Sequence, residues 1–286
     1  MDIRLRLAIQ KSGRLSEGSL ELVRECGVSF TQAMGKLKAD SHNFPLEFLF
    51  LRDDDIPKYV ANGIADIGIV GENVLVEKAE DVEMVEKLGF SKCRLSIAVP
   101  KEHDFYGVED LEGLKIATSY PRLLQAYLDQ EGIKAEIHEI SGSVEIAPSI
   151  GLADAVCDIV SSGSTLISNG LKEVLKIFKS EAVLIANKQM LPERQEILEQ
   201  LLFRIHAVKK AGNFKYILMN VPNDAIAKVS SILPVMKSPS VMPLAMEGWS
   251  SLHSVVNEDE FWKVIEQLKA AGAEGILVIP IEKMIS

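Results

Sequence analysis

The stretch GLADAVCDIVSSGSTLISNGL, residues 151–171, changes its pattern twice and decides how the rest of the chain is interpreted. It begins with an apolar spacing typical of a helix, contracts to the strand-like run 158–160, and then places four hydroxyl side chains around one glycine. A second helical pattern follows. A strand that ends in such a loop directs backbone N–H groups, hydroxyls and the positive end of a helix dipole toward one point. The loop therefore has the composition of a phosphate-binding turn.

Two interpretations of this loop remain open on its residues alone. In the first, the loop wraps a phosphate group, and Asp158 accepts hydrogen bonds from the vicinal hydroxyls of a 5′-phosphorylated ribose. In the second, the loop is only the capped start of a helix, and Asp158 is a charge at a strand edge. The loop lacks the lysine of a Walker-type nucleotide loop, which excludes that class. Its residues are Ser161, Ser162, Gly163, Ser164 and Thr165.

Strand-like and helix-like patterns alternate from the N-terminus to about residue 211. Such alternation predicts βαβ units and a parallel sheet. The expected elements are a strand at 4–9, a helix at 17–26 with Ser16 as its N-cap, a strand at 45–52, a helix at 53–63, and a strand, a turn at Gly71 and a helix over 65–77.

The same order of elements recurs in the second half of this region. Residues 113–133 again contain a strand, a polar turn with an arginine, a helix and a glycine. The same 92 positions separate Asp66 from Asp158 (158 − 66) and Gly71 from Gly163 (163 − 71). We therefore predict two similar α/β lobes whose strand ends face a shared cleft.

The repeat and a change of pattern near residue 212 divide the chain into three predicted domains. The two lobes are residues 1–94 with 180–211 and residues 95–179. Residues 212–286 give the order β-α-β-β-α-β, typical of the split ferredoxin-like unit, and we expect this third domain to be regulatory or oligomeric. Its expected elements are strands at 214–221, 240–245, 249–256 and 275–281, and helices at 223–236, begun by Asn223 or Asp224, and at 258–273.

The composition indicates an ordinary globular protein of acidic character. Hydrophobic residues make up 47% of the chain and charged residues 25%, and the formal net charge is −10. This charge argues against non-specific binding to nucleic acid or to a membrane surface, but not against small anionic ligands at helix N-termini. Three cysteines without metal-type spacing, and an N-terminus without a secretory pattern, lead us to expect a cytoplasmic protein.

Motifs along the whole chain carry a family resemblance. They include LAIQKSGRL (7–15), RDDDIP (52–57), DIGIVGENV (66–74), IATSYP (116–121) and ILVIPIEKM (276–284), together with the stretch that contains the hydroxyl loop. In these motifs the chain resembles the ATP phosphoribosyltransferase family, in its long form with a C-terminal regulatory domain. The resemblance implies a periplasmic-binding-protein-like two-lobe catalytic core and an ACT-like third domain that binds histidine. It also implies a magnesium-dependent reaction and dimers that assemble into hexamers.

The resemblance further implies a role for each candidate residue. The hydroxyl loop would bind the 5′-phosphate of phosphoribosyl pyrophosphate and Asp158 its ribose, while Glu145 is a further acid of the cleft. Asp154, one helical turn before Asp158 in the predicted helix, would assist or simply lie at a helix end. Lys11 would contact polyphosphate, and with Asp158 and Glu145 it completes the expected catalytic set. The residues that would bind ATP are Gly13, Arg14, Arg52, Asn73 and Tyr120.

The implied reaction transfers the phosphoribosyl group to N1 of ATP, the first step of histidine biosynthesis, with L-histidine as feedback inhibitor. N1 of adenine has a free lone pair, so the demanding event is departure of pyrophosphate through an oxocarbenium-like ribose. Mg²⁺ would arrive on the pyrophosphate, and no dedicated metal ligands are expected. Met242 and Met246 depart from the family pattern, which leaves the effector contacts open. The implied histidine site comprises Ser238, Ser240, Met242 and Leu244.

Two rival functions fit the same patterns. A non-catalytic two-lobe solute-binding protein would share the core, and a catalytically inactive paralogue would share the whole chain. The hydroxyl-rich loop and the lack of a secretory pattern disfavour the first. The intact turns at 11–14 and 158–165 disfavour the second.

Overall fold

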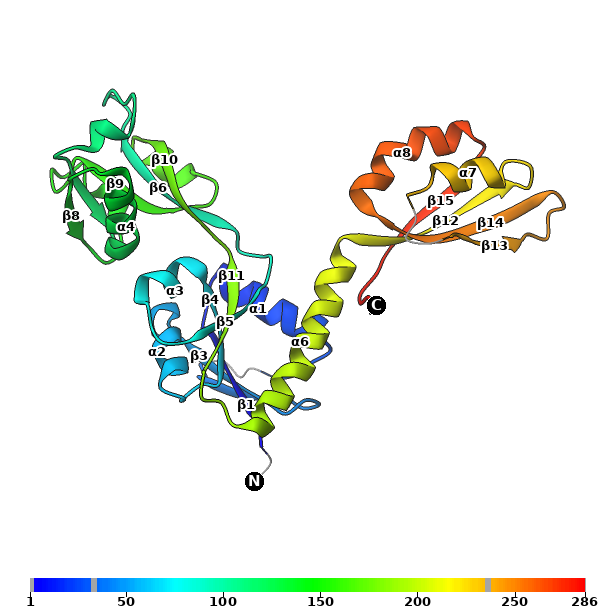
Figure 1. Ribbon diagram of the computed structural model, residues 1–286, viewed down its shortest axis with the longest axis horizontal. Coiled ribbons are helices and arrows are strands. Elements are labelled where there is room, and N and C mark those ends of the chain that lie inside the picture. Colours follow the sequence, from blue (N-terminus) through cyan, green and yellow to red (C-terminus); the bar gives the residue numbers. More distant parts are fainter. Residues whose placement is uncertain (1–2, 32–34, 235–237, 286) are drawn as a thin grey trace. The chain divides into compact units, whose positions relative to one another are not determined.

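The computed structural model describes residues 3–31, 35–234 and 238–285, which form three separate sheets (Figure 1). The chain divides into two compact units, Met1–Glu21 with Val28–Leu198 and Leu22–Gly27 with Glu199–Ser286. The first unit contains two sheets, which we call lobe I and lobe II, and the second unit contains the third sheet. No helix within the described residues is both long and apolar enough to cross a membrane.

Lobe I is built on a six-stranded sheet in the order β2-β3-β1-β4-β11-β5. Its central strands β3, β1 and β4 are parallel, whereas β2, β11 and β5 run antiparallel to their neighbours. The strands are β1 Leu5–Gln10, β2 Lys38–Asp40, β3 Leu46–Leu51, β4 Ile67–Gly71, β5 Glu83–Lys87 and β11 Ala182–Ala186. The helices are α1 Arg14–Glu25, the 3₁₀ turn η1 Asp53–Asp55, α2 Ile56–Ala61 and α3 Glu72–Lys78.

The core of lobe I fills both faces of its central strands, as parallel strands covered by helices require. Leu7, Phe48 and Ile67 are each fully buried. Gly68 allows α2 to approach β4 closely, because a Cβ atom there would lie 2.6 Å from Cγ2 of Ile56. This close packing fixes the position of β4, and α3 begins directly after that strand.

Lobe II is built on a five-stranded sheet in the order β10-β6-β9-β7-β8. Its apolar core includes Leu95, Ile116, Leu124 and Cys157, all fully buried. The strands are β6 Cys93–Pro100, β7 Lys115–Thr118, β8 Glu136–Glu139, β9 Ala155–Val160 and β10 Leu171–Ser180. The helices are η2 Val108–Leu111, α4 Pro121–Glu131, η3 Val144–Ile146 and α5 Ser164–Ser168.

The two lobes share one topology, which confirms the predicted pair of similar α/β lobes. The order β3-β1-β4-β11 in lobe I corresponds to β8-β7-β9-β6 in lobe II. In each lobe the first three of these strands are parallel and the fourth is antiparallel. The predicted parallel sheet is present in three adjacent strands of each lobe, and antiparallel strands extend both sheets. Since β6 and β11 arrive from the other lobe without a crossover helix, they enter their sheets in the opposite direction.

The internal repeat has a different register from the one that the sequence suggested. Asp66 lies just before β4, and its Oδ2 accepts a hydrogen bond from Arg6 N of β1 at 2.8 Å. Asp154 lies just before β9, and its Oδ2 accepts from Lys115 N of β7, also at 2.8 Å. Asp154 is therefore the counterpart of Asp66, at a spacing of 88 (154 − 66), and the predicted match of Asp66 with Asp158 was wrong.

This shift has a local cause in the stretch 151–157. The sequence predicted a helix there, with Asp154 one turn before Asp158, but residues 151–154 are turn and irregular backbone and residues 155–157 are the first half of β9. A short apolar run cannot be assigned to helix or strand by its spacing alone. Asp154 and Asp158 consequently lie four strand residues apart, about 13 Å at the usual strand rise.

Two predicted helix starts in lobe I also differ from the structure. Ser16 was expected to cap a helix, but α1 already begins at Arg14 and Ser16 is buried inside its first turn. The expected helix at 53–63 begins as the 3₁₀ turn η1 and becomes α-helical only at Ile56. Gly71 ends β4 with an extended φ of −68° and directly precedes α3, so no left-handed turn separates them.

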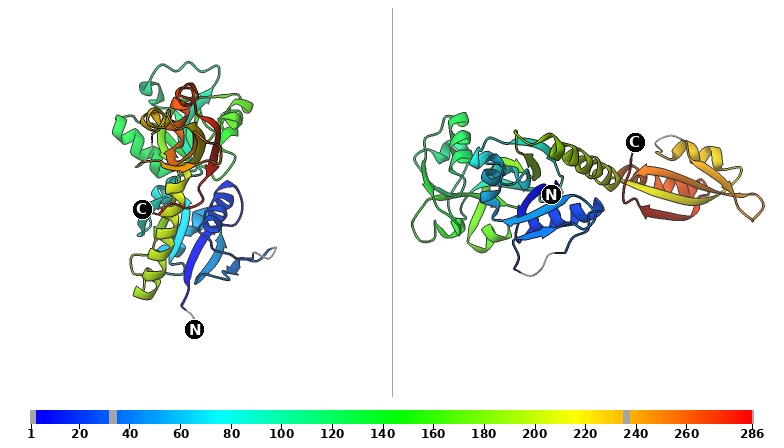
Figure 2. Two further views of the ribbon diagram at one scale, coloured as in Figure 1. Left: turned by 90° about the vertical axis from the view of Figure 1, so that its right-hand side faces the viewer. Right: turned by 90° about the horizontal axis from the view of Figure 1, so that it is seen from below.

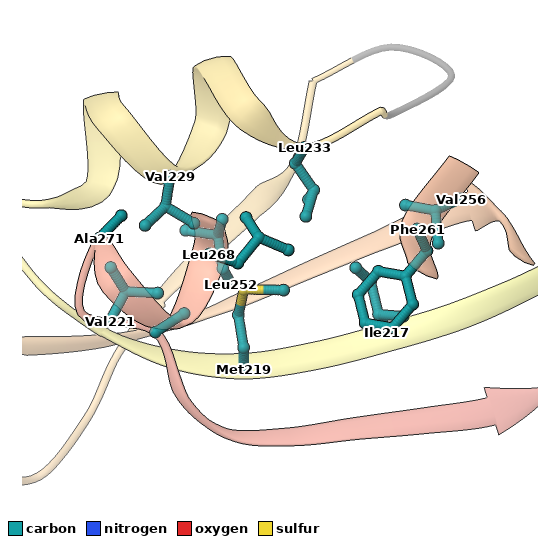
Figure 3. Close-up of a cluster of buried hydrophobic side chains, with 11 residues drawn as sticks. Ile217, Met219, Val221, Val229, Leu233, Leu252, Val256, Phe261, Leu268 and Ala271 are labelled. Atoms are coloured by element: carbon teal, nitrogen blue, oxygen red, sulfur yellow. The ribbon is translucent and has the colours of Figure 1, made fainter. Parts of the chain in front are cut away.

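The second unit has the predicted β-α-β-β-α-β order on a four-stranded sheet, β13-β14-β12-β15. Helices α7 and α8 lie on the same side of this sheet (Figures 1 and 2) and bury Val229, Phe261 and Leu268 against it (Figure 3). The elements are β12 Phe214–Pro222, α7 Ile226–Ile232, β13 Ser240–Pro243, β14 Trp249–Asn257, α8 Glu258–Ala270 and β15 Glu274–Pro280. The helix α6 Pro192–Gly212 begins in the first unit and continues into the second.

Helix α7 is shorter than the predicted helix at 223–236. Asn223 does not cap it, because its Oδ1 accepts a hydrogen bond from Ser250 Oγ at 2.7 Å and thereby ties the end of β12 to β14. Residues 235 and 236 of the predicted helix lie outside the described residues.

Candidate active site

A cavity of about 630 Å³ lies between the two lobes, at the carboxyl ends of their parallel strands. Each parallel strand is followed by a residue that lines the cavity, as the general location of ligand sites in α/β sheets predicts. In lobe I these residues are Arg14 after β1, Asp53 after β3 and Asn73 after β4. In lobe II they are Tyr120 after β7 and Glu145 after β8, together with the end of β9 and the hydroxyl loop, Asp158 and Ser161–Thr165.

The hydroxyl loop lines this cavity along its whole length. Gly163 has φ +84°, a conformation that residues with a Cβ atom rarely adopt, and it turns the chain from β9 into α5. The hydroxyls of Ser162 and Ser164 share a hydrogen bond at 3.0 Å. The first N–H groups of α5 have no intrahelical acceptor, as at any helix start. The loop therefore offers hydroxyls and backbone N–H groups to the same part of the cavity.

Two arginines hold the first residue of the loop. From β6, Arg94 donates Nη1 to Ser161 O at 3.0 Å, and a bidentate pair with Glu173 (Nε–Oε1 2.5 Å, Nη2–Oε2 2.6 Å) fixes its guanidinium. From lobe I, Arg14 donates Nη1 to Ser161 Oγ at 3.2 Å. Ser96 Oγ adds a bond to Glu173 Oε1 at 2.8 Å. A planar, bidentate ion pair of this kind fixes the orientation of the arginine as well as its position. Arg94 therefore holds Ser161, the first residue of the loop, in a defined position.

Three acidic residues line the cavity, Asp53, Glu145 and Asp158. Asp158 is half-buried near the end of β9, where burial raises the pKa of its carboxyl group and the charge of Glu145 raises it further. A hydrogen bond from Ile159 N to Asp158 Oδ1 at 2.7 Å opposes both effects. Glu145 belongs to η3, which begins after Ser143 at φ +51°, an uncommon conformation for a non-glycine residue.

A chain of polar groups joins the lobes on one side of the cavity. Ser180, at the end of β10, donates its hydroxyl to Asn73 Oδ1 at 2.8 Å, and Asn73 Nδ2 donates to Tyr120 Oη at 3.1 Å. Asn73 is only 6% exposed. Burial raises the pKa of the Tyr120 hydroxyl, and the negative charge of Asp158 raises it further. Tyr120 is therefore a neutral phenol whose ring borders the cavity.

Four of the residues predicted for the catalytic and substrate sites do not line the cavity. Lys11, Gly13 and Arg52 are exposed in the turns after β1 and β3, next to residues that do line it. Asp154 lies at the opposite, amino end of β9, where its carboxylate is occupied by Lys115 N.

Several cavity residues had no signal in the sequence. Ser91 and Lys92, in the connection between β5 and β6, and Cys93, the first residue of β6, line the cavity, although no strand-turn-helix pattern in the sequence includes them. Asp53 belongs to the motif RDDDIP, of which only the arginine, Arg52, is predicted as a site residue. Arg94 lies inside β6, and a charged residue inside a strand does not by itself indicate contact with a distant loop.

The predicted histidine-binding residues lie together in the second unit. Ser240 and Met242 belong to β13, the edge strand of the sheet, and are exposed. Leu244 N donates to Trp249 O at 3.0 Å, which closes the β13–β14 hairpin. Ser238, two residues before β13, is also exposed.

Comparisons with known proteins extend over the whole chain. The sequence models of two families match it, ATP phosphoribosyltransferase (HisG) over residues 52–207 and the HisG C-terminal domain over residues 211–283. An ATP phosphoribosyltransferase from Cytophaga hutchinsonii is 64% identical over 281 residues, 98% of each chain. Another from Phocaeicola vulgatus is 58% identical over 98% of this chain and 99% of that protein.

Solved structures agree with these sequence matches. A chain of the ATP phosphoribosyl transferase (HisG:HisZ) complex from Thermotoga maritima is 29% identical with a TM-score of 0.61, and the match covers 71% of this chain and 96% of that one. A periplasmic sulfonate-binding protein from Methylobacillus flagellatus shares the fold alone, at 18% identity and a TM-score of 0.51 over 74% and 69% of the two chains.

The sequence matches show that this two-lobed α/β core, with a hydroxyl-rich loop and several acids in one cavity, is that of a pentosyltransferase. The chain belongs to the ATP phosphoribosyltransferase family, in the long form that carries the C-terminal domain. It is accordingly a pentosyltransferase of histidine biosynthesis.

Proposed function

We propose that the chain transfers the 5-phosphoribosyl group of phosphoribosyl pyrophosphate to N1 of ATP and releases pyrophosphate. The observation that supports this most directly is the position of the hydroxyl loop and Asp158 in one cavity with Arg14, Asn73 and Tyr120. The first set suits a phosphorylated sugar, and the second suits a purine nucleotide. A cavity of about 630 Å³ is within the range of small-molecule sites.

The sugar side of the site belongs to lobe II in this proposal. The 5′-phosphate binds to the hydroxyls and N–H groups of residues 161–165, and the ribose hydroxyls donate to Asp158. Arg94 keeps the start of the loop in place, while Arg14 brings a positive charge from lobe I to the same point. Asp154, whose carboxylate is occupied elsewhere, has no part in this site.

The nucleotide side combines both lobes. The phenol ring of Tyr120 offers a face for stacking on adenine, and Asn73 beside it offers an amide for hydrogen bonding. Arg14 supplies a cation for the phosphates, with Lys11 and Arg52 in neighbouring turns as further contacts.

The chemistry follows from how the substrates are held. Adenine N1 attacks C1 of the ribose while the bond from C1 to the pyrophosphate oxygen breaks, so positive charge develops on the ribose. The carboxylates of Asp158 and Glu145, which both line the cavity, would stabilise this charge, because groups of opposite sign that are already in position need no reorganisation as the charge develops. Alignment of N1 with C1 between the lobes supplies the rest of the rate enhancement.

No three histidine, cysteine, aspartate or glutamate side chains of the described residues lie close enough together to form a metal site. Mg²⁺ would therefore be held largely by the pyrophosphate, with one or two of the cavity carboxylates Asp53, Glu145 and Asp158 as protein oxygen ligands. Bound with the pyrophosphate, the metal would neutralise the charge that leaves with that group.

We further propose that residues 212–286 form a regulatory domain that binds L-histidine at Ser238, Ser240, Met242 and Leu244, and that the chain works in the cytoplasm as dimers and hexamers. The exposed edge strand β13 supports the site, since its polar backbone groups are accessible to an amino acid. Added L-histidine should lower the turnover of the full chain, and truncation before Ala211 should remove this response. If added L-histidine left the turnover of the full chain unchanged, the regulatory assignment would be refuted.

The catalytic proposal is tested by product formation. The chain is mixed with ATP, phosphoribosyl pyrophosphate and Mg²⁺, and phosphoribosyl-ATP is measured by mass spectrometry. Asp158→Asn should lower turnover while ATP still binds, because Asp158 lies among the lobe II residues that hold the ribose. Failure of the unaltered chain to form the adduct would instead favour a non-catalytic binding protein.

A further inference from the structure

One face of α3 in lobe I holds the start of α4 in lobe II. Asn73 and Glu77 lie four positions apart on α3, so they share a face of this helix. Asn73 Nδ2 donates to Tyr120 Oη at 3.1 Å. Both carboxylate oxygens of Glu77 accept hydrogen bonds from backbone, Oε1 from Arg122 N and Oε2 from Leu123 N, each at 3.0 Å. The same face thus holds Tyr120 and the two residues that begin the turn after it.

The start of α4 depends on this contact for its hydrogen bonds. The first N–H groups of a helix have no intrahelical acceptor. Pro121 has no N–H, and Leu124 N donates to Tyr120 O at 3.0 Å. The side chain of Tyr120, the N-cap residue, makes no capping bond. The two N–H groups between Pro121 and Leu124 have their acceptor in Glu77, a residue of the other lobe.

We propose that Glu77 is a positioning residue of the purine subsite: it caps α4 only while the two lobes are together, and so holds Tyr120 beside Asn73. This inference rests on the proposed function, in which Tyr120 stacks on the adenine of ATP. A carboxylate at a helix start acts both as a hydrogen-bond acceptor and as a charge that complements the helix dipole. When the lobes separate, α4 loses this cap and Tyr120 loses its bond to Asn73.

The two substrates should respond differently to the loss of this cap. ATP would contact residues of both lobes, so its apparent affinity scales with the fraction of molecules in the capped arrangement. Phosphoribosyl pyrophosphate would bind mainly to the loop and Asp158, which both belong to lobe II. A change at Glu77 should therefore weaken ATP far more than it weakens the sugar substrate.

The experiment compares Glu77→Ala, Glu77→Gln and the unaltered full-length chain. Hydrogen–deuterium exchange of the peptide that contains Arg122 and Leu123 reports the cap, and calorimetry gives the dissociation constant of each substrate separately. Loss of a helix cap corresponds to a roughly two- to thirtyfold change in an equilibrium. We expect faster exchange and weaker ATP binding within that range in Glu77→Ala, while phosphoribosyl pyrophosphate stays within about twofold. Glu77→Gln should lie between, because its single carbonyl oxygen can replace one of the two acceptors.

The control is Glu80→Ala, which removes a carboxylate just after the same helix. The Glu80 side chain makes no hydrogen bond or ion pair to any residue that the structure describes. This variant should match the unaltered chain in exchange and in both affinities. The milder Glu77→Gln variant keeps the test valid if Glu77→Ala does not fold.

Each result has a distinct meaning. Unchanged exchange at Arg122 and Leu123, or unchanged ATP affinity with a lost cap, would overturn the inference. Equal weakening of both substrates would overturn it as well, since this would indicate a general structural role. The exchange measurement needs no turnover, so failure of the chain to make phosphoribosyl-ATP would refute the proposed function separately.

Discussion

Replacement of Asp154 tests whether its carboxylate serves to contact a neighbouring strand or to bind substrate. Asp154 is exposed, and its carboxylate accepts one hydrogen bond, from Lys115 N at 2.8 Å. Its counterpart Asp66 is 3% exposed and accepts four, from Arg6 N, Nε and Nη2 and from Arg194 Nη1, at 2.8–3.0 Å. The same position in the two lobes thus carries one polar contact in one lobe and a buried ionic network in the other.

The expected cost of each substitution follows from these contacts. Asp154→Ala removes one exposed hydrogen bond, which costs about 0.5–1.5 kcal/mol of unfolding free energy. Asp66→Ala leaves two arginines without their partner, a change that costs about 3–5 kcal/mol when the pair is buried. Because the side chains of Arg6 and Arg194 are 25% and 24% exposed, we expect the low end, about 3 kcal/mol.

Urea unfolding followed by circular dichroism measures both costs, and calorimetry with phosphoribosyl pyrophosphate measures binding. Asp154→Ala should bind this substrate within about twofold of the unaltered chain, while Asp158→Asn should bind it at least about tenfold more weakly, the loss of one charged hydrogen bond. If Asp154→Ala instead weakened binding as much as Asp158→Asn does, the assignment of Asp154 as a strand contact would be wrong. Equal costs of Asp66→Ala and Asp154→Ala would refute the reasoning on stability.

Three further changes test other parts of the structure. Binding of phosphoribosyl pyrophosphate should weaken as the pH falls, with a midpoint above the ordinary aspartate value of about 3.9, because burial and Glu145 raise the pKa of Asp158. Calorimetry across pH 4–7 should show a smaller loss of binding in Asp158→Asn, which keeps only the part that comes from the substrate's own phosphate, with its second pKa of about 6. The raised pKa of Asp158 affects the free energy of unfolding in the opposite direction to the lowered pKa of an aspartate in a salt bridge. The contribution of Asp158 to this free energy is fully present below its unfolded pKa and is lost as the pH rises through its raised folded pKa. Gly163→Ala should lower turnover and cost about 1–2 kcal/mol, since φ +84° strains any residue with a Cβ atom, and an alanine variant with normal turnover would contradict the role of this turn. Gly68→Ala should cost about 1–3 kcal/mol in urea unfolding, because its Cβ would lie 2.6 Å from Ile56 Cγ2; a cost near zero would mean that α2 moves freely.

The periodic spacing of apolar residues predicted most of the fold, and the hydroxyl loop predicted where the cavity lies. The alternation of strands and helices gave two similar lobes and the β-α-β-β-α-β domain, because these patterns reflect burial along each element. The hydroxyl loop and Tyr120 follow strand ends, and Asp158 lies near the end of β9, where ligand sites of α/β sheets lie. These residues meet in the cavity although up to 45 positions separate them (165 − 120).

Contacts between distant segments were not predictable from single-sequence patterns. Arg94 reaches Ser161 because β6 pairs with β9 in antiparallel register, opposite Val160, and no spacing in the sequence encodes that register. Glu77 caps α4 only because the lobes meet there. The misassigned helix at 151–157 had a further effect, since it displaced the repeat by four residues and made Asp158 the apparent partner of Asp66.

The order of strands in lobe I affects how the chain can fold during synthesis. Strand β11, residues 182–186, lies between β4 and β5, so β5 has no neighbour in the sheet until a segment about 95 residues later in the sequence has emerged from the ribosome. Lobe II is continuous from β6 to β10 and can be complete before that moment. The nascent chain would then finish its second lobe before its first, and an unpaired β5 would need protection in the interval.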